Sequence, residues 1–189
     1  GAPTLLEGKS TISQNEAKNI AAEFLDIESG SLDFVVQENG KTPTFRFAKS
    51  GVDITVTSKG GYVLYMRKNR EITEHIISYK QALEKAKRFL ENKGLSPFIE
   101  TYYFIDEGVC VINFAFLDGQ TVCYTDLLKV GIAMDNGEVM LYESGGYLSN
   151  HKARAFETAI HTAEEASKKV SLDLKIVKTA VTLIPTSKG

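Results

Sequence analysis

The sequence has few cysteines, no tryptophan, no long apolar run and no excess of positive charge, and these absences exclude several classes of protein. Two cysteines in 189 residues are too few for a disulfide framework. No stretch approaches the roughly 20 consecutive apolar residues of a membrane-spanning helix, and no basic segment followed by an apolar one marks a secretion signal. A net charge of -2 argues against a nucleic-acid partner, which would require a basic face.

The two cysteines, Cys110 and Cys123, lie on either side of Asp118-Gly119, a strong signal for a two-residue hairpin turn. With Asp118 and Gly119 as the two loop residues, Cys110 faces Leu127 and Cys123 faces Phe114. The sulfurs are then about two residue pairs out of register, whereas a disulfide needs Cα atoms within about 7 Å. We therefore expect two buried free thiols that pack as small hydrophobic residues.

The same kind of helix start occurs three times along the chain. A hydroxyl residue at the N-cap is followed three residues later by glutamate or glutamine, and each side chain can bond to the other residue's backbone N–H. Apolar residues then recur at helical spacing, so each helix has one face to bury. The caps are Ser13 with Glu16, Ser78 with Gln81, and Thr162 with Glu165; the stripes are Ala17, Ile20, Ala21, Phe24 and Leu25, then Ala82, Leu83, Ala86, Phe89 and Leu90, then Ala166 and Val170.

Strand-like segments follow the first two helices in the same order. Apolar and polar residues alternate with period two in several of them, and turn residues separate the segments. The expected strands are 33–37, 44–48, 52–56 and 62–67 after the first helix, and 101–105, 109–117, 121–134 and 138–142 after the second. This order predicts an α+β fold of tandem repeats, each with one helix packed on an antiparallel sheet, with a first unit at 1–72 and a second at 73–149.

A third unit, at 150–189, is truncated. After its helix start, 172–183 alternates as one long strand or a broken pair of strands. An unpaired apolar strand promotes aggregation, so we expect 175–183 to pair with another strand. Exchange of this remnant between two copies would give a homodimer, so self-association through the third unit is a further hypothesis.

Residues that carry catalytic or metal chemistry are sparse. The three histidines, His75, His151 and His161, form no metal-binding motif, and His75 is expected in solvent within a linker. No G-x-S-x-G nucleophile motif occurs, and the glycine pairs at 60–61 and 145–146 are expected in hairpin turns rather than in a phosphate-binding loop. We therefore predict that the chain is not an enzyme and has no catalytic, cofactor-binding or metal-binding residues.

Aromatic residues gather in the strands of the second unit. Alternation places Tyr103 on the opposite face from Tyr102 and Phe104, so we expect one set in the core and the other partly exposed. An exposed aromatic face would be a natural partner-binding surface. Coverage of both faces by helices is an equally good reading, so the pattern leaves the partner interface unknown.

Polar linkers separate the units and carry basic residues. Lys68, Arg70, Lys152 and Arg154 are expected to be exposed there. Trypsin-like proteases cleave after Lys and Arg in flexible segments, so we expect 150–154 to be a cleavage segment.

The helix start I-S-x-x-[E/Q]-A, at 12–17 and again at 77–82, followed by a meander that ends in a hairpin, resembles the PepSY domain. Tandem copies at this spacing, together with the run at 168–180, resemble the C-terminal region of the YpeB family of spore germination proteins from Leu5 onward. The third copy departs most, because His161 precedes its cap where the others have isoleucine and because the unit is truncated.

The resemblance implies a non-enzymatic, extracytoplasmic protein on the outer side of the spore inner membrane, attached through an N-terminal anchor absent from this chain. In this family the protein and the cortex-lytic enzyme SleB depend on one another, and PepSY domains restrain or stabilise secreted hydrolases. The implied role is to bind, stabilise and/or inhibit a SleB-like hydrolase until germination. The alternatives are a peptidoglycan-binding module of the spore envelope and a small-ligand carrier, for which we expect a cavity lined by tyrosine and phenylalanine from one sheet face.

Overall fold

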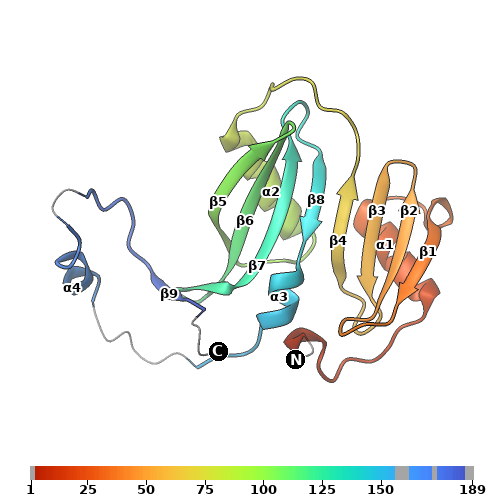
Figure 1. Ribbon diagram of the computed structural model, residues 1–189, viewed down its shortest axis with the longest axis horizontal. Coiled ribbons are helices and arrows are strands. Elements are labelled where there is room, and N and C mark those ends of the chain that lie inside the picture. The colour runs from red at the N-terminus through yellow and green to blue at the C-terminus, as the bar shows by residue number, and fades with distance from the viewer. Residues whose placement is uncertain (1–2, 156–161, 172–173, 186–189) are drawn as a thin grey trace.

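The computed structural model describes residues 3–155, 162–171 and 174–185. Each of the two long helices is followed by four antiparallel strands, as the sequence predicts (Figure 1). The first set is α1 (Gln14–Leu25), β1 (Asp33–Glu38), β2 (Thr44–Lys49), β3 (Val52–Thr57) and β4 (Val63–Lys68); the second is α2 (Tyr79–Asn92), β5 (Phe98–Asp106), β6 (Val109–Asp118), β7 (Thr121–Ala133) and β8 (Val139–Glu143). The remaining elements are η1 (Thr4–Leu6), η2 (Ser29–Ser31), α3 (Gly145–Asn150), α4 (Ala163–Ser167) and β9 (Val181–Leu183).

All three predicted capping boxes form. In α1 the Ser13 N–H donates to the Glu16 carboxylate at 2.7 Å, and the Glu16 N–H donates to the Ser13 hydroxyl at 3.2 Å. The third helix, α4, ends at Ser167, so the expected apolar stripe does not continue to Val170, which is exposed. A five-residue helix has too little length to present a stripe of that kind.

The two halves form a single sheet. The strand order is β1-β2-β3-β4-β8-β7-β6-β5, and β4 pairs with β8 in antiparallel register, with Met66 opposite Tyr142. Helices α1 and α2 cover the same face of this sheet (Figure 1). No helix of the described residues has the length and apolarity that crossing a bilayer requires.

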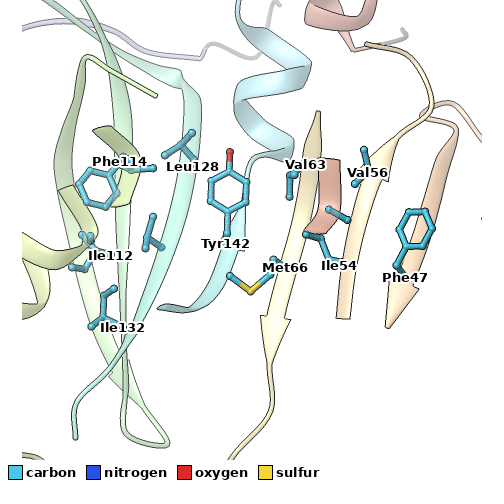
Figure 2. Packing of buried hydrophobic residues seen from close by; sticks show 14 of the residues in the cluster. Phe47, Ile54, Val56, Val63, Met66, Ile112, Phe114, Leu128, Ile132 and Tyr142 are labelled. Carbon is cyan, nitrogen blue, oxygen red and sulfur yellow. The ribbon is translucent and has the colours of Figure 1, made fainter. Parts of the chain in front are cut away.

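The core is continuous across the junction between the halves. Buried side chains of both sets of strands belong to one cluster, and Figure 2 shows Tyr142 between the side chains of β6 and β7 and those of β3 and β4. The Tyr142 ring lies 5.0 Å from that of Phe24 on α1 and 6.0 Å from that of Phe89 on α2, measured between centroids. Phe24 and Phe89 also contact each other edge to face, at 5.5 Å. Both helices therefore meet over β8.

The linker after β4 is bound to the turn between β7 and β8. Arg70 donates to both carboxylate oxygens of Asp135, at 2.6 and 2.9 Å, and to Glu138 at 2.9 Å. Lys68 donates to Glu138 at 2.7 Å. Lys68 and Arg70 are half-buried, so the expectation that they are exposed was wrong. The sequence could not show this, because their acidic partners lie about seventy residues away.

The hairpin between β6 and β7 has a different register from the predicted one. Phe116 pairs with Cys123, and a bulge of residues 124–126 then places Cys110 opposite Ile132. Both cysteines are nonetheless free and buried, as predicted. The prediction for the second glycine pair was wrong, because Gly145 and Gly146 begin α3 and not a hairpin turn. Glycine at 146 allows a close approach to β7, since a Cβ there would lie 2.9 Å from the Leu127 carbonyl oxygen.

The C-terminal segment forms less strand than expected. Among the described residues after 171, only Val181–Leu183 is β-structure, and it pairs in parallel with 121–123 of β7. The described residues 174–180 belong to no strand, so the pairing expected for 175–183 is present at its end alone. Residue His161 and the start of the predicted strand, 172–173, lie outside the described residues.

Gly108, in the turn between β5 and β6, is required for contact with the linker. Its φ is +77°, and a Cβ there would lie 2.6 Å from Cγ2 and 2.8 Å from Cβ of Ile72. We expect Gly108→Ala to lower the free energy of unfolding by about 2 kcal/mol, through backbone strain and overpacking together. Urea denaturation measures this loss. Gly119→Ala is the control, since Gly119 also has positive φ but has open space around it. An equal loss in both variants would show that the Ile72 contact contributes nothing.

Candidate functional site

The described residues contain no group of three or more His, Cys, Asp or Glu side chains placed to hold a metal ion. Burial raises the pKa of both thiols, Cys110 and Cys123, which makes the reactive thiolate scarce at neutral pH. His75 is exposed in the linker, as the sequence predicts. Among the histidines of the described residues, only His151 contacts a carboxylate.

His151 belongs to a cluster around the fully buried Asp126. The Arg154 guanidinium donates to both Asp126 oxygens at 2.6 and 2.7 Å, Thr125 Oγ1 donates at 2.6 Å, and His151 Nδ1 lies 2.9 Å from Oδ2. Burial by itself raises the pKa of Asp126, but hydrogen bonds from Arg154, Thr125 and His151 outweigh it and hold the pKa below its usual value. The cluster holds an ionised carboxylate in a structural role.

This cluster overturns part of the prediction for the linker at 150–154. Arg154 was expected to be exposed, but its side chain is only 10% exposed because both ends of its guanidinium are bound to Asp126. Lys152 is exposed, as expected. The Lys152 side chain is therefore accessible to a trypsin-like protease, whereas the Arg154 side chain is held by Asp126.

A cleft of about 690 Å³ lies between the two halves. Its lining includes Phe24 of α1, Tyr62 before β4, Tyr142 of β8 and Tyr147 of α3. The size is within the range of small-ligand pockets. However, its walls combine helices, turns and the strands β4 and β8 from both halves, whereas the carrier hypothesis expects tyrosine and phenylalanine from a single sheet face.

The largest run of exposed apolar side chains in a strand is on β5, at the edge of the sheet. We call it the aromatic edge, and it consists of Tyr102, Tyr103, Phe104 and Ile105. All four side chains are between 43% and 58% exposed. The expectation that one alternate set lies in the core was therefore wrong, because β5 is the last strand and no strand of the described residues covers its outer side.

The aromatic edge is supported from beneath by α2. The Tyr103 ring stacks on that of Tyr79, the first residue of α2, with centroids 3.8 Å apart and planes 17° apart. From Tyr102 to Asp106 the strand pairs with β6 without interruption, after a bulge between Glu100 and Tyr102. The exposed side chains thus stand on a regular ladder, which makes them suitable anchors for a partner.

The opposite edge of the sheet, β1, is also partly apolar. Phe34, Val35 and Val36 are between 36% and 47% exposed. Here a bulge falls between Phe34 and Val36, within the apolar run itself. Bulges of this kind blunt a sheet edge against further strand pairing, so the two edges differ in how readily they accept another strand.

Comparison with known proteins places this architecture in a family. Residues 2–157 match the family described as YpeB sporulation, PepSY1 and PepSY2 domains. The chain belongs to the YpeB family. Sporulation protein YpeB of Halalkalibacterium halodurans is 28% identical over 190 residues, and that of Bacillus subtilis 27% identical over 197 residues. These matches cover 96% and 97% of the chain but only 42% and 43% of the relatives, so the chain spans less than half the length of these YpeB proteins.

The solved Bacillus megaterium YpeB C-terminal domain has the same fold, with a TM-score of 0.84 and 20% sequence identity. That likeness covers 94% of this chain and 83% of the solved one. Membership of the YpeB family confirms the resemblance inferred from the repeated helix start.

Proposed function

We propose that the chain is a non-enzymatic partner of a SleB-like cortex-lytic hydrolase, which it binds and stabilises or inhibits until germination. The observation that carries this proposal is the aromatic edge, a run of four exposed large apolar residues on a well-ordered strand. Exposed apolar patches of this kind mark protein interaction sites, and aromatic residues dominate interface energetics. Membership of the YpeB family supports the sporulation setting.

Binding would stabilise the hydrolase by mass action. A partner that binds only the folded enzyme raises its free energy of unfolding by about 2.7 kcal/mol at a hundredfold excess over Kd. If the bound chain also covers the catalytic cleft, the hydrolysis rate falls in parallel. The proposal includes an extracytoplasmic location on the outer side of the spore inner membrane, through an N-terminal anchor outside this chain.

We also propose a division of the chain into three units. We keep tandem PepSY units at 1–72 and 73–149 and a partial unit at 150–189, with self-association through the partial unit as a further hypothesis. Support comes from the repeated order of one helix and four strands and from the third capping box.

The test is calorimetric titration of the purified chain into a SleB-like hydrolase, with the rate of cortex hydrolysis followed in parallel. Binding that lowers the rate would identify an inhibitor, and binding at an unchanged rate a stabilising partner. No heat of binding at micromolar concentrations would contradict the proposal. Tyr102→Lys/Phe104→Lys on the aromatic edge should weaken this binding, and Phe34→Lys/Val36→Lys, which adds the same two charges to the other sheet edge, is the control.

The cleft between the halves favours one alternative, a peptidoglycan-binding or small-ligand module. Co-sedimentation with purified sacculi separates this alternative from hydrolase binding. Retention of the chain on sacculi, reduced by Tyr62→Ala in the cleft and unaffected by Tyr102→Ala on the aromatic edge, would support it.

A further inference from the structure

We infer that β5 accepts one additional strand from a partner, an extended segment with alternating apolar residues and a basic end. The inference rests on the proposed function for the identity of the partner and names the chemistry of the segment that binds. In the described residues β5 pairs only with β6, so alternate backbone N–H and C=O groups on its outer side are available for a further ladder.

The positions of the exposed side chains favour a partner strand that pairs with the edge of β5 over a partner that docks on one face of the sheet. Tyr102 and Phe104 point to the face opposite the helices, whereas Tyr103, stacked on Tyr79, is on the helix-covered face with Ile105. An added strand presents side chains to both faces at once. It would therefore cover all four exposed residues, which docking on a single face would not.

The charge at the end of β5 indicates the polarity of the partner segment. Asp106 and Glu107 are exposed and form no ion pair with other described residues. The adjoining groove, which has a volume of about 730 Å³, is also lined by Arg67, Lys68 and Arg70. Lys68 and Arg70 are bound to acids of the β7–β8 turn, and Arg67 is exposed and forms no ion pair with Asp106 or Glu107. A lysine or arginine at the end of the incoming strand would therefore find unpaired carboxylates.

The other edge lacks this combination. On β1 the apolar run contains the bulge, whereas on β5 the run from Tyr102 to Asp106 is regular. A regular strand presents its outer N–H and C=O groups at even spacing, whereas a bulge disrupts that spacing. On β1 the disruption falls within the run of apolar side chains. The two edges of the same sheet can therefore serve as test site and matched control.

The experiment measures binding of synthetic peptides by fluorescence anisotropy. The probe has nine residues, like β5, with valine and tyrosine alternating with threonine and two lysines at its N-terminal end. In an antiparallel arrangement those lysines lie beside Asp106 and Glu107. We expect the probe to bind about tenfold more tightly than a peptide with two glutamates in place of the lysines.

Variants of the chain locate the site. Tyr102→Lys/Phe104→Lys should weaken binding of the probe by about tenfold, because lysines on an edge strand oppose strand addition. Phe34→Lys/Val36→Lys on β1 should change the affinity by less than about twofold. Asp106→Lys/Glu107→Lys should reverse the preference, so that the glutamate peptide binds more tightly than the lysine peptide.

Several outcomes would overturn the inference. These are no saturable binding up to about 1 mM, equal affinity for the two peptides, or a larger loss in the β1 variant than in the β5 variant. A dimer of the chain that the β5 variant dissociates, seen by sedimentation velocity, would assign the edge to a second copy instead. The probes contain no hydrolase sequence, so their failure and a failure of hydrolase binding are separate results.

Discussion

Replacing Tyr142 by alanine is expected to lower the free energy of unfolding by about 4 kcal/mol, in the range measured for large-to-small changes of buried aromatic residues. The side chain is 3% exposed and contacts Phe24 of α1 and Phe89 of α2. It stands on β8, which pairs with β4 of the first half. The cavity left by Tyr142→Ala would therefore lie where both helices and both halves of the sheet meet.

Urea denaturation followed by circular dichroism measures this loss. Tyr142→Phe keeps the ring and should cost less than about 1 kcal/mol. Tyr102→Ala removes an equally large but exposed side chain, and it should change the stability by less than about 0.5 kcal/mol. A Tyr142→Ala protein as stable as the parent would mean that the two halves are not joined through this core.

Asp126→Ala is expected to cost about 3 kcal/mol at neutral pH. Removing one partner of a buried ion pair leaves the other charge without compensation. Here Asp126 is fully buried, and the Arg154 side chain that loses its partner is 10% exposed. The same change frees His151 and Arg154 from β7, so trypsin should cleave after Arg154 faster in the variant than in the parent chain.

The pH dependence of this difference has a defined sign. The pKa of Asp126 is lower in the folded chain than its usual value, so its contribution is complete above the unfolded pKa of about 3.9 and is lost as pH falls through the folded pKa. The difference in stability between parent and variant should therefore begin to shrink as the pH falls below about 4 and should vanish below the folded pKa. Asp53→Ala, which breaks the exposed pair with Arg46, should cost less than about 0.5 kcal/mol. A gap for Asp126→Ala that is equally large in acid would contradict an electrostatic origin.

Local structure was predictable because its causes lie within a few residues of one another. The capping boxes of Ser13, Ser78 and Thr162 depend on a partner three residues away, and all three form. The strands after α1 and α2 follow from period-two patterns and lie within a few residues of the predicted bounds. The burial of Cys110 and Cys123 was also predicted, although the hairpin register was not, because the three-residue bulge before Leu127 has no local signal.

The candidate site was predictable only in part. Aromatic residues concentrate in 102–104 of the sequence, and the alternation of their faces is visible there. That β5 is the outermost strand, and that both alternate sets are therefore exposed, depends on the strand order of the whole sheet. The Asp126 cluster was missed because His151 and Arg154 lie 25 and 28 residues from Asp126, and nothing in their local sequence indicates the contact.

The sequence by itself determined the two long helices, the four strands that follow each of them, the α+β class and the membership in the YpeB family. These depend on short-range caps, turns and periodicity that each segment carries alone. Tertiary structure alone decided that β4 pairs with β8, that both helices share one core over Tyr142, and that no strand of the described residues pairs with the outer side of the aromatic edge. Those features follow from pairing and packing between segments far apart in the sequence, where the free energy depends on how whole faces fit and not on any local pattern.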